Sequence, residues 1–242
     1  MKRTLLFILS LLITTHSMSF GELTPLQEVK GEKKIKVIYT AALLNHLFKM
    51  RKDEYIKCIK ILNNYGYEPY VIESCKASSP SFFEDHTPFV FYANTNDYSL
   101  KNKGVNEAKA MIKAFEYYNF DDDDIIIKIT GRYHLDSPYF LHVVENNQDA
   151  DAFGKFDPIA TLTDKGRVFT GCFALRCKYF KEFVKNLDLV KMEKEMIDIE
   201  REAAAYIMNL SEKGHKVIFL DKLDMTAGIA GGGNGFPNFI HL

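Results

Sequence analysis

Residues 125–135 (IIIKITGRYHL) combine a hydrophobic run with cationic and hydroxyl side chains that could bind a charged ligand. The isoleucines predict a buried central strand. Because successive side chains of a strand point to opposite faces, the polar residues that follow in alternation share one face: Lys128, Thr130, Arg132 and His134. Open α/β sheets bind ligands at the carboxyl ends of their strands. Two cations there indicate a site for a phosphate-bearing molecule.

Each of these residues also has an ordinary structural explanation. Lys128 could extend its ammonium group to solvent at the strand end, but burying that group without a partner costs free energy, which favours ligand contact. Arg132 could form an ion pair with one of the aspartates at 121–124. Gly131, between the two cations, would let a ligand approach the backbone. We expect His134 to be a hydrogen-bonded structural residue.

A second candidate anion site is the segment 102–110 (NKGVNEAKA), where a loop enters a helix. Free amides at a helix start attract anions. Gly104 permits close approach of a ligand, and Lys103 adds positive charge. Neither the Walker pattern GxxxxGK followed by Ser or Thr nor a GxGxxG fingerprint is present. The alternative is an ordinary helix start with a solvated lysine.

Acidic residues near 198–202 could supply a general base. They lie at or just inside a predicted helix start, where the helix dipole alone favours acidic residues. A general base must also face a cleft, and Glu200, with Asp198 beside it, is our candidate. The aspartates at 121–124 precede the strand, so the polarity of the sheet places them opposite the expected site. We expect them to be solvated rather than metal-binding.

The elements that would position these residues follow an α/β pattern. Strands are predicted at 36–44, 67–74, 88–94, 125–135, 151–156, 167–175 and 216–223. Helices are predicted at 53–65, 102–120, 177–187 and 195–213. Strands separated by helices indicate a mostly parallel sheet with right-handed crossovers. We expect residues 228–239 to form a flexible tail or a loop that covers a ligand.

Composition narrows the choice of partners. The chain has 242 residues and a formal net charge of −1, which argues against a nucleic-acid binder or a polybasic membrane binder. Disulfides can form among its four cysteines if the chain is exported, although isolated buried thiols are at least equally expected in a domain of this size. The cysteines are Cys58, Cys75, Cys172 and Cys177.

The N-terminus has the layout of a secretory signal peptide. In residues 1–20 a charged start precedes a short apolar core and small residues, and residues 21–34 form a polar linker. We expect export to the exterior, the periplasm or a secretory lumen. The alternative is a signal anchor, in which case the chain would be attached to a membrane, although the apolar core is short for a spanning helix.

The order of these segments resembles that of GT-A-type glycosyltransferases, which move a sugar from a nucleotide donor to an acceptor. Residues 36–44 are similar to the first strand of that superfamily, 102–110 to its helix-opening segment and 125–135 to the strand that ends in a metal-binding DxD motif. Residues 169–183 resemble its acceptor-side unit, and 197–207 resemble an acidic helix that often contributes a base. KITGRY is also similar to the KxSGRY-type stretch of some bacterial and viral glycosyltransferase-like proteins.

The resemblance implies an α/β fold, GT-A-like, with a Rossmann-type, mostly parallel sheet flanked by helices and a mixed acceptor-side half. It implies a single domain over 35–242, with a nucleotide-binding half at about 35–140, an acceptor half at 141–225 and a flexible tail at 226–242. The catalytic residues would be Glu200 and Asp198. The nucleotide-sugar would be held by Thr40, Lys103, Gly104, Lys128, Gly131, Arg132 and Tyr133.

The main departure from the family is the missing DxD motif, because residues 129–131 (ITG) occupy its place. In the family a divalent ion such as manganese neutralises the donor diphosphate. Lys128 and Arg132, with Lys103, would supply that charge here, so we expect no cofactor. The alternative is a bound divalent metal such as manganese, which no DxD motif supports. The expected activity is transfer from a nucleotide-sugar donor to an unknown glycan or other acceptor.

Two alternatives remain from the sequence. One is an exported, non-catalytic protein of the same fold that binds a nucleotide or a glycan. The other is a secreted hydrolase, which is disfavoured because a GxSxG nucleophile elbow and metal-ligand spacings are missing. Compartment also bears on the choice, because nucleotide sugars are not expected in a bacterial periplasm. A transferase would be better placed in a lumen or on a membrane.

Overall fold

The computed structural model describes residues 35–43, 48–77, 81–155, 171–227 and 240–241. The predicted signal segment at 1–20 and the linker at 21–34 lie outside these residues, as do 228–239, most of the predicted tail. Within the described part of the chain, no helix combines the length and the apolar character needed to cross a membrane.

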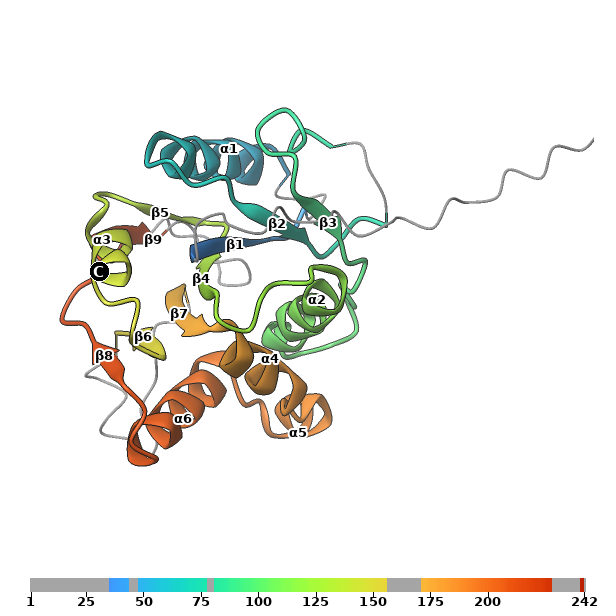
Figure 1. The fold of residues 1–242 in the computed structure, drawn as a ribbon. Helices are drawn as coiled ribbons and strands as arrows, with labels where there is room; N and C mark the ends of the chain where they lie inside the picture. Colours follow the sequence, from blue (N-terminus) through green and yellow to red (C-terminus); the bar gives the residue numbers. More distant parts are fainter. Residues whose placement is uncertain (1–34, 44–47, 78–80, 156–170, 228–239, 242) are drawn as a thin grey trace, which may run out of the picture.

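Strands and helices alternate through most of the chain (Figure 1). The strands are β1 (Ile35–Ala41), β2 (Tyr70–Glu73), β3 (Val90–Tyr92), β4 (Ile125–Thr130), β5 (Tyr133–Leu135), β6 (Ala152–Gly154), β7 (Cys172–Arg176), β8 (Val217–Phe219), β9 (Met225–Ala227) and β10 (Ile240–His241). The helices are α1 (Phe48–Asn64), α2 (Lys103–Tyr117), α3 (Tyr139–Glu145), α4 (Cys177–Lys185), α5 (Leu189–Glu195) and α6 (Ile199–Glu212).

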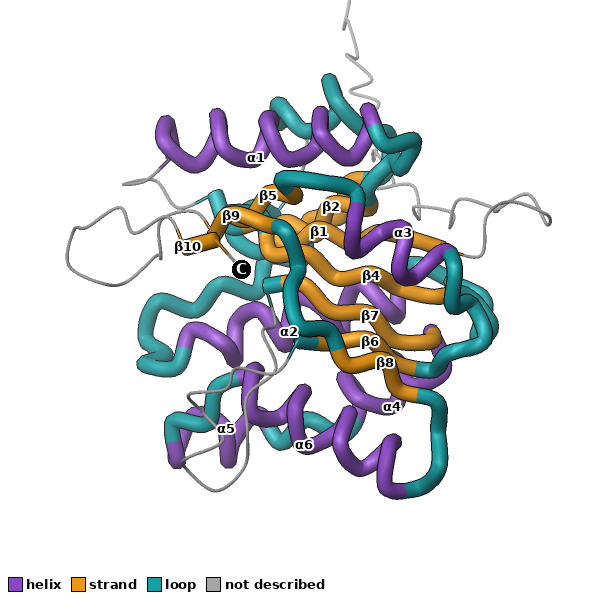
Figure 2. The backbone as a smooth tube through the Cα atoms, turned by 90° about the vertical axis from the view of Figure 1, so that its left-hand side faces the viewer, coloured by secondary structure: helices purple, strands orange, loops and turns teal. Residues whose placement is uncertain are grey.

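Seven strands form one sheet in the order β3-β2-β1-β4-β7-β6-β8. Figure 2 shows the strands from β2 through β1, β4, β7 and β6 to β8 side by side. Strand β1 pairs in parallel with both β2 and β4. Strand β7 is antiparallel to its neighbours β4 and β6, whereas β6 and β8 are parallel. The predicted fold class, an α/β domain with a mostly parallel sheet and a mixed second half, is confirmed.

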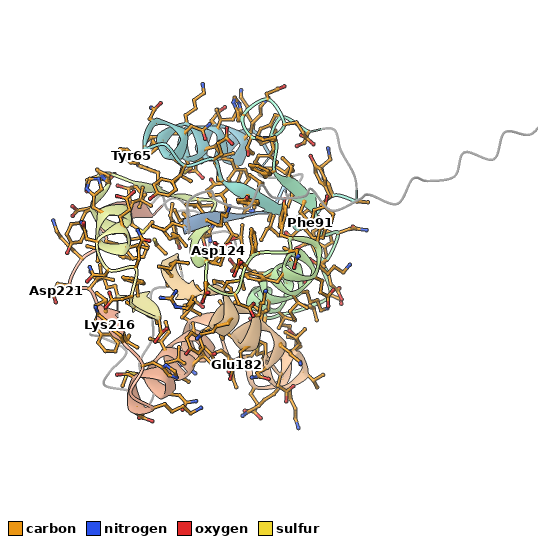
Figure 3. All side chains as sticks on the ribbon, viewed as in Figure 1. Tyr65, Phe91, Asp124, Glu182, Lys216 and Asp221 are labelled. Atoms are coloured by element: carbon orange, nitrogen blue, oxygen red, sulfur yellow. The ribbon has the colours of Figure 1, made fainter. Side chains whose placement is uncertain are left out.

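Helices cover both faces of this sheet and bury two separate cores. Helices α2, α4, α5 and α6 lie on one side, and α1 and α3 lie on the other (Figure 1). Neighbouring residues of β1 contribute to different cores, Ile38 to the first and Tyr39 to the second. A strand buried on both faces reads as a continuous hydrophobic run, which is why β1 was visible in the sequence. Figure 3 shows side chains filling the space between the sheet and the helices on each of its faces.

The predicted strand at 125–135 is wrong as one element, because it bends after Thr130. Strand β4 ends there, and Tyr133 begins β5, which belongs to a second sheet of order β10-β9-β5. A Cβ atom on Gly131 would lie 2.6 Å from the Thr40 carbonyl oxygen and 2.7 Å from a Tyr55 ring carbon. The packing of β1 and α1 therefore requires glycine at this position, whether or not a ligand also approaches it as predicted.

The predicted helix at 195–213 begins later, at α6, because the chain turns between α5 and α6. Met196 ends α5 in the left-handed conformation, with φ of 53°. Asp198 then caps α6 by accepting a hydrogen bond from the amide of Arg201. The predicted tail from 226 is also corrected, since Thr226 and Ala227 belong to β9, which pairs with β5.

All four cysteines are free thiols in the structure. Cys58, Cys172 and Cys177 are buried, and Cys75 is partly exposed. Isolated thiols, one of the two alternatives left by the sequence, are therefore what the structure contains.

Candidate functional site

A cavity of about 470 Å³ opens at the carboxyl ends of β1 and β4. The chain runs outward from β1 through β2 to β3 and then returns to β4 on the other side of β1. Such a reversal of strand order leaves a crevice where α/β sheets bind ligands. The cavity is lined by Thr40, Ala41, Ala42, Arg51, Tyr55, Ile72, Ser74, Asn96, Tyr98, Lys103, Gly104, Asn106, Glu107, Ala110, Thr130, Gly131, Arg132, Asp198, Ile199 and Glu200.

The structure brings together most of the site residues that the sequence predicted. They come from the end of β1, the start of α2, the turn after β4 and the start of α6. The seven that line the cavity are Thr40, Lys103, Gly104, Gly131, Arg132, Asp198 and Glu200. Lys128 and Tyr133 are not among the lining residues.

Lys128 is fully buried, so the position predicted for it is wrong. Its ammonium lies 2.7 Å from the Glu107 carboxylate and donates a hydrogen bond to the Thr130 hydroxyl at 2.6 Å. A charge without solvent needs a paired group and hydrogen bonds, and α2 supplies that group because Glu107 faces β4. Lys128 therefore does not line the cavity but pairs with Glu107, which does.

Glu107 is the carboxylate at the bottom of the cavity. Its side chain is 25% exposed and also accepts a hydrogen bond from the Thr40 hydroxyl at 2.8 Å. Burial alone would raise the pKa of Glu107. The Lys128 ammonium, hydrogen bonds from Lys128 and Thr40, and the charge of Arg132 outweigh burial and hold this pKa below its usual range. Glu107 is thus an anion at neutral pH, compensated by Lys128.

Two guanidinium groups line the cavity near α1. Arg51, at the start of α1, is buried and donates a hydrogen bond to the Ala42 carbonyl at 2.9 Å. The Arg132 guanidinium carbon lies 5.5 Å from the centre of the Tyr133 ring, so Tyr133 contacts a lining residue from outside the cavity. Both arginines act on Glu54: burial raises the pKa of Glu54, and the two positive charges oppose that rise.

The starts of α2 and α6 meet at the cavity. Asn102 caps α2 by accepting from the amide of Gly104, and its side-chain nitrogen donates to the Met192 and Ile197 carbonyls, which precede α6. A Cβ atom on Gly104 would lie 3.5 Å from the amide nitrogen of Ile199. The start of α2 thus lies in ordinary contact distance of the start of α6, and Gly104 also lines the cavity. Helix starts favour anions.

The other charged side chains that line the cavity, Lys103, Asp198 and Glu200, differ in the hydrogen bonds that they make within the protein. The Lys103 ammonium donates a hydrogen bond to the Leu100 carbonyl at 2.6 Å. The Asp198 carboxylate accepts from the amide of Arg201 at 2.9 Å as the cap of α6. Glu200 lies in the first turn of α6 and lines the cavity. Of the two predicted catalytic carboxylates, Glu200 is the one not used as a helix cap.

The residues do not provide a metal site of the DxD kind. Residues 129–131 carry no carboxylate at the end of β4. Across the ranges that the structure describes, no group of three or more His, Cys, Asp and Glu residues is arranged to hold a metal ion. Asp124, labelled in Figure 3, directly precedes β4, and Asp122 pairs with Lys181 at 2.6 Å.

Sequence reasoning missed four notable residues of this cavity. Glu107 and Asn106 lie within the segment 102–110, in which the sequence predicted ligand contacts only for Lys103 and Gly104. Arg51 is one of several cations in a helix without a distinguishing spacing. Tyr98 lies in a polar loop with no periodic pattern. The one available signal for Glu107 was a lysine within a predicted buried strand, because its ammonium requires a carboxylate from another element.

Comparison with known proteins gives similarity at the level of solved structures only. No family model matches this chain, and no curated protein matches it. A glycosyltransferase involved in glycosylation of the major capsid of PBCV-1 matches at 10% identity, covering 77% of this chain and 81% of that chain, with a TM-score of 0.46. The galactosyltransferase LgtC, solved with donor and acceptor sugar analogues, matches at 12% identity, 76% and 72% coverage and a TM-score of 0.45.

A third similar structure is a 4-diphosphocytidyl-2C-methyl-D-erythritol synthase, at 10% identity, 78% and 89% coverage and a TM-score of 0.48. Similarity at this distance concerns the path of the chain and assigns no activity. Two of these three similar structures are glycosyltransferases.

Proposed function

We propose that this chain is a glycosyltransferase that moves a sugar from a nucleotide-sugar donor to a glycan or other acceptor. The observation that carries the proposal is the cavity at the carboxyl ends of β1 and β4, where Arg51, Lys103 and Arg132 line the wall together with two helix starts. Guanidinium and ammonium groups and helix amides are the groups that proteins use to bind phosphates.

The diphosphate would lie against Arg132 and Lys103, with the nucleoside toward Thr40. Negative charge grows on the diphosphate as its bond to the anomeric carbon breaks, and fixed cations stabilise that charge without reorganising. Glu200 would accept the proton of the acceptor hydroxyl while the hydroxyl oxygen bonds to the anomeric carbon. The products are the glycosylated acceptor and a nucleoside diphosphate.

Lys128 would act on this reaction through Glu107 and not by contact with the donor. A carboxylate at the bottom of the cavity repels a diphosphate, and the Lys128 ammonium at 2.7 Å compensates its charge. Arg132 would then bind the diphosphate beside a carboxylate whose charge Lys128 offsets. We propose that these side chains do the work that a DxD-bound ion does in the family, so that transfer needs no added metal.

Calorimetry with UDP, GDP and CMP tests the proposal, with manganese and separately with a chelator. We expect one of the three nucleotides to bind in the presence of the chelator. Arg132→Ala should lower the affinity for that nucleotide by about tenfold or more, since a charge-assisted hydrogen bond is lost. Lys60→Ala is the matched control, because Lys60 is an exposed cation of α1 outside the cavity lining. Failure of all three nucleotides to bind would contradict the proposal.

Release of a nucleoside diphosphate from the matching nucleotide sugars separates catalysis from binding. The proposal expects release that depends on an acceptor and is insensitive to chelator. Tight nucleotide binding without release from any donor would identify a non-catalytic binding protein instead.

We also propose that residues 1–20 direct export or anchoring into a secretory lumen, where nucleotide sugars are available. The N-terminal residue of the purified mature chain tests this part. A start near residue 21 supports a cleaved signal, and a retained Met1 in the membrane fraction supports an anchor. A retained Met1 in the cytosol would overturn the export proposal.

A further inference from the structure

Tyr98, in the loop between β3 and α2, lines the cavity and is 68% exposed. Large aromatic side chains usually bury most of their surface. Among the residues that the structure describes, none makes a hydrogen bond or a ring contact with Tyr98. An exposed ring at the edge of a cavity is therefore left to contact whatever enters it.

The loop that carries Tyr98 is held firmly on both sides. The Asn106 side chain, buried on α2, accepts from the amide of Asp97 at 3.0 Å and donates to the Asp97 carbonyl at 3.0 Å. Asp97 in turn accepts from the amide of Ser99 at 2.9 Å. The amide of Asn96 donates to the Ser74 carbonyl at 2.9 Å, after β2. The backbone on either side of Tyr98 is thus held in place, while the residue itself stays exposed.

The order of the strands places Tyr98 and Arg132 on opposite sides of β1. The loop of Tyr98 is bonded to the exit of β2, and Arg132 follows β4, while β1 lies between β2 and β4. Neighbouring strands are about 4.8 Å apart, so the two exits are separated by about 10 Å. A nucleotide has a flat base at one end and a diphosphate at the other, with a ribose between them.

The walls on the side of Tyr98 suit a flat apolar group. Ala41 and Ala42 from the end of β1 and Ile72 from β2 line the cavity with small or aliphatic side chains. Stacking on an aromatic ring tolerates any base, because every base has a π-face. Of the charged lining residues, Asp198 and Glu200 come from the start of α6 and Arg132 from the turn after β4, whereas Arg51 already donates to the Ala42 carbonyl.

We infer that Tyr98 is the stacking platform for the nucleobase of the ligand, with the diphosphate directed to Arg132. This inference rests on the proposed function and adds a residue that fixes the nucleoside end of the site. Stacking by the ring requires the aromatic face and not the hydroxyl group. Tyr98→Phe should therefore keep the affinity for a nucleotide, and Tyr98→Ala should lose it.

Calorimetry with UDP, GDP or CMP, whichever binds the wild type most tightly, and with inorganic pyrophosphate tests the inference. Tyr98→Ala should weaken nucleotide binding by about 5- to 150-fold, the range measured for a lost base–aromatic stack. It should leave pyrophosphate binding within about twofold, because pyrophosphate has no base. Phe219→Ala, which removes a 48% exposed aromatic of β8 outside the cavity lining, should change neither.

The outcomes separate this inference from the proposed function. Unchanged nucleotide binding in Tyr98→Ala overturns the inference alone, as does equal weakening of nucleotide and pyrophosphate. Weakening in Tyr98→Phe as large as in Tyr98→Ala also overturns it, because a hydroxyl contact would then be responsible. Nucleotide binding to neither the wild type nor any variant overturns the proposed function and the inference together.

Discussion

The floor and the rim of the cavity use similar residue types in different ways. The floor is defined as four residues joined by hydrogen bonds or an ion pair at the bottom of the cavity. The rim is defined as four residues that line the cavity from the surrounding loops and helix starts. The floor comprises Thr40, Glu107, Lys128 and Thr130. The rim comprises Tyr98, Lys103, Arg132 and Glu200.

Charges in the floor compensate one another, whereas those of the rim are presented to the cavity. Removing a floor residue leaves a partner without its bond in a region of little solvent. Removing a rim residue takes away a side chain that lines the cavity and leaves the buried ion pair of the floor in place. The comparison therefore predicts that floor variants lose stability first, and that rim variants lose ligand binding or turnover while remaining folded.

The largest expected effect is on turnover, at the rim. Glu200→Gln keeps the shape of the side chain but removes the proposed base, so transfer should fall about 10²- to 10⁴-fold. Nucleotide affinity should stay within about twofold, because Gln keeps its polar contacts. Initial rates and calorimetry check the two parts. Glu202→Gln in the same helix turn, outside the cavity lining, is the control; equal rates for both variants would remove Glu200 from the reaction.

The next effect is on stability, in the floor. Glu107→Gln removes the carboxylate beside a fully buried ammonium, and we expect a loss of about 3 kcal/mol in the free energy of unfolding. Lys128→Met should cost less, because the carboxylate left behind is partly exposed and solvent can reach it. Urea denaturation measures both losses. The double variant should lose less than the sum of the two singles; simple additivity would mean that the ion pair is not energetically coupled.

A smaller effect is the pH dependence that this ion pair adds to stability. Glu107 has a lowered pKa when folded, so its contribution is fully present above the unfolded pKa of about 4.3. It is lost as the pH falls from there through the lowered folded value. Urea denaturation from about pH 7 to about pH 3 should show a steeper loss of stability for wild type than for Lys128→Met, which lacks the main opposing charge. Identical profiles would contradict the assignment.

The smallest expected effect is a loss of nucleotide affinity in Lys103→Ala, a rim variant. The Lys103 ammonium already donates to the Leu100 carbonyl and is exposed to solvent, where charges are screened. Nucleotide affinity should fall by less than about fivefold, and more at low salt than at high salt. Lys101→Ala, an exposed cation outside the cavity lining, is the control. A loss as large as that of Arg132→Ala would show that Lys103 is a principal phosphate ligand.

Hydrophobic patterns were enough to predict the sheet, its mostly parallel character and the edge at which the cavity opens. Hydrophobic patterns could not predict that Lys128 is buried whereas Arg132 lines the cavity, because alternation puts both side chains on one face of a continuous strand. This difference comes from two distant contacts: Glu107 of α2 pairs with Lys128, and Thr40 and Tyr55 crowd Gly131, after which the chain leaves the sheet. Pairing across elements depends on packing that local patterns do not contain.

The break between α5 and α6 and the exposed ring of Tyr98 were missed for a related reason. Apolar residues continue at helical spacing across Met196, so the pattern hides a left-handed residue that tertiary contacts stabilise. Tyr98 belongs to a polar loop whose conformation is set by one buried amide, that of Asn106. Such contacts between a loop and a helix carry no period that a sequence can display.

A crystal structure of the chain with UDP, grown in the presence of a chelator, tests most directly whether fixed cations take the place of a metal ion. The diphosphate should lie within hydrogen-bond distance of the Arg132 guanidinium, beside the start of α2, with Lys128 still paired to Glu107. A diphosphate bound elsewhere, or one that enters the cavity only when manganese is supplied, would contradict the account.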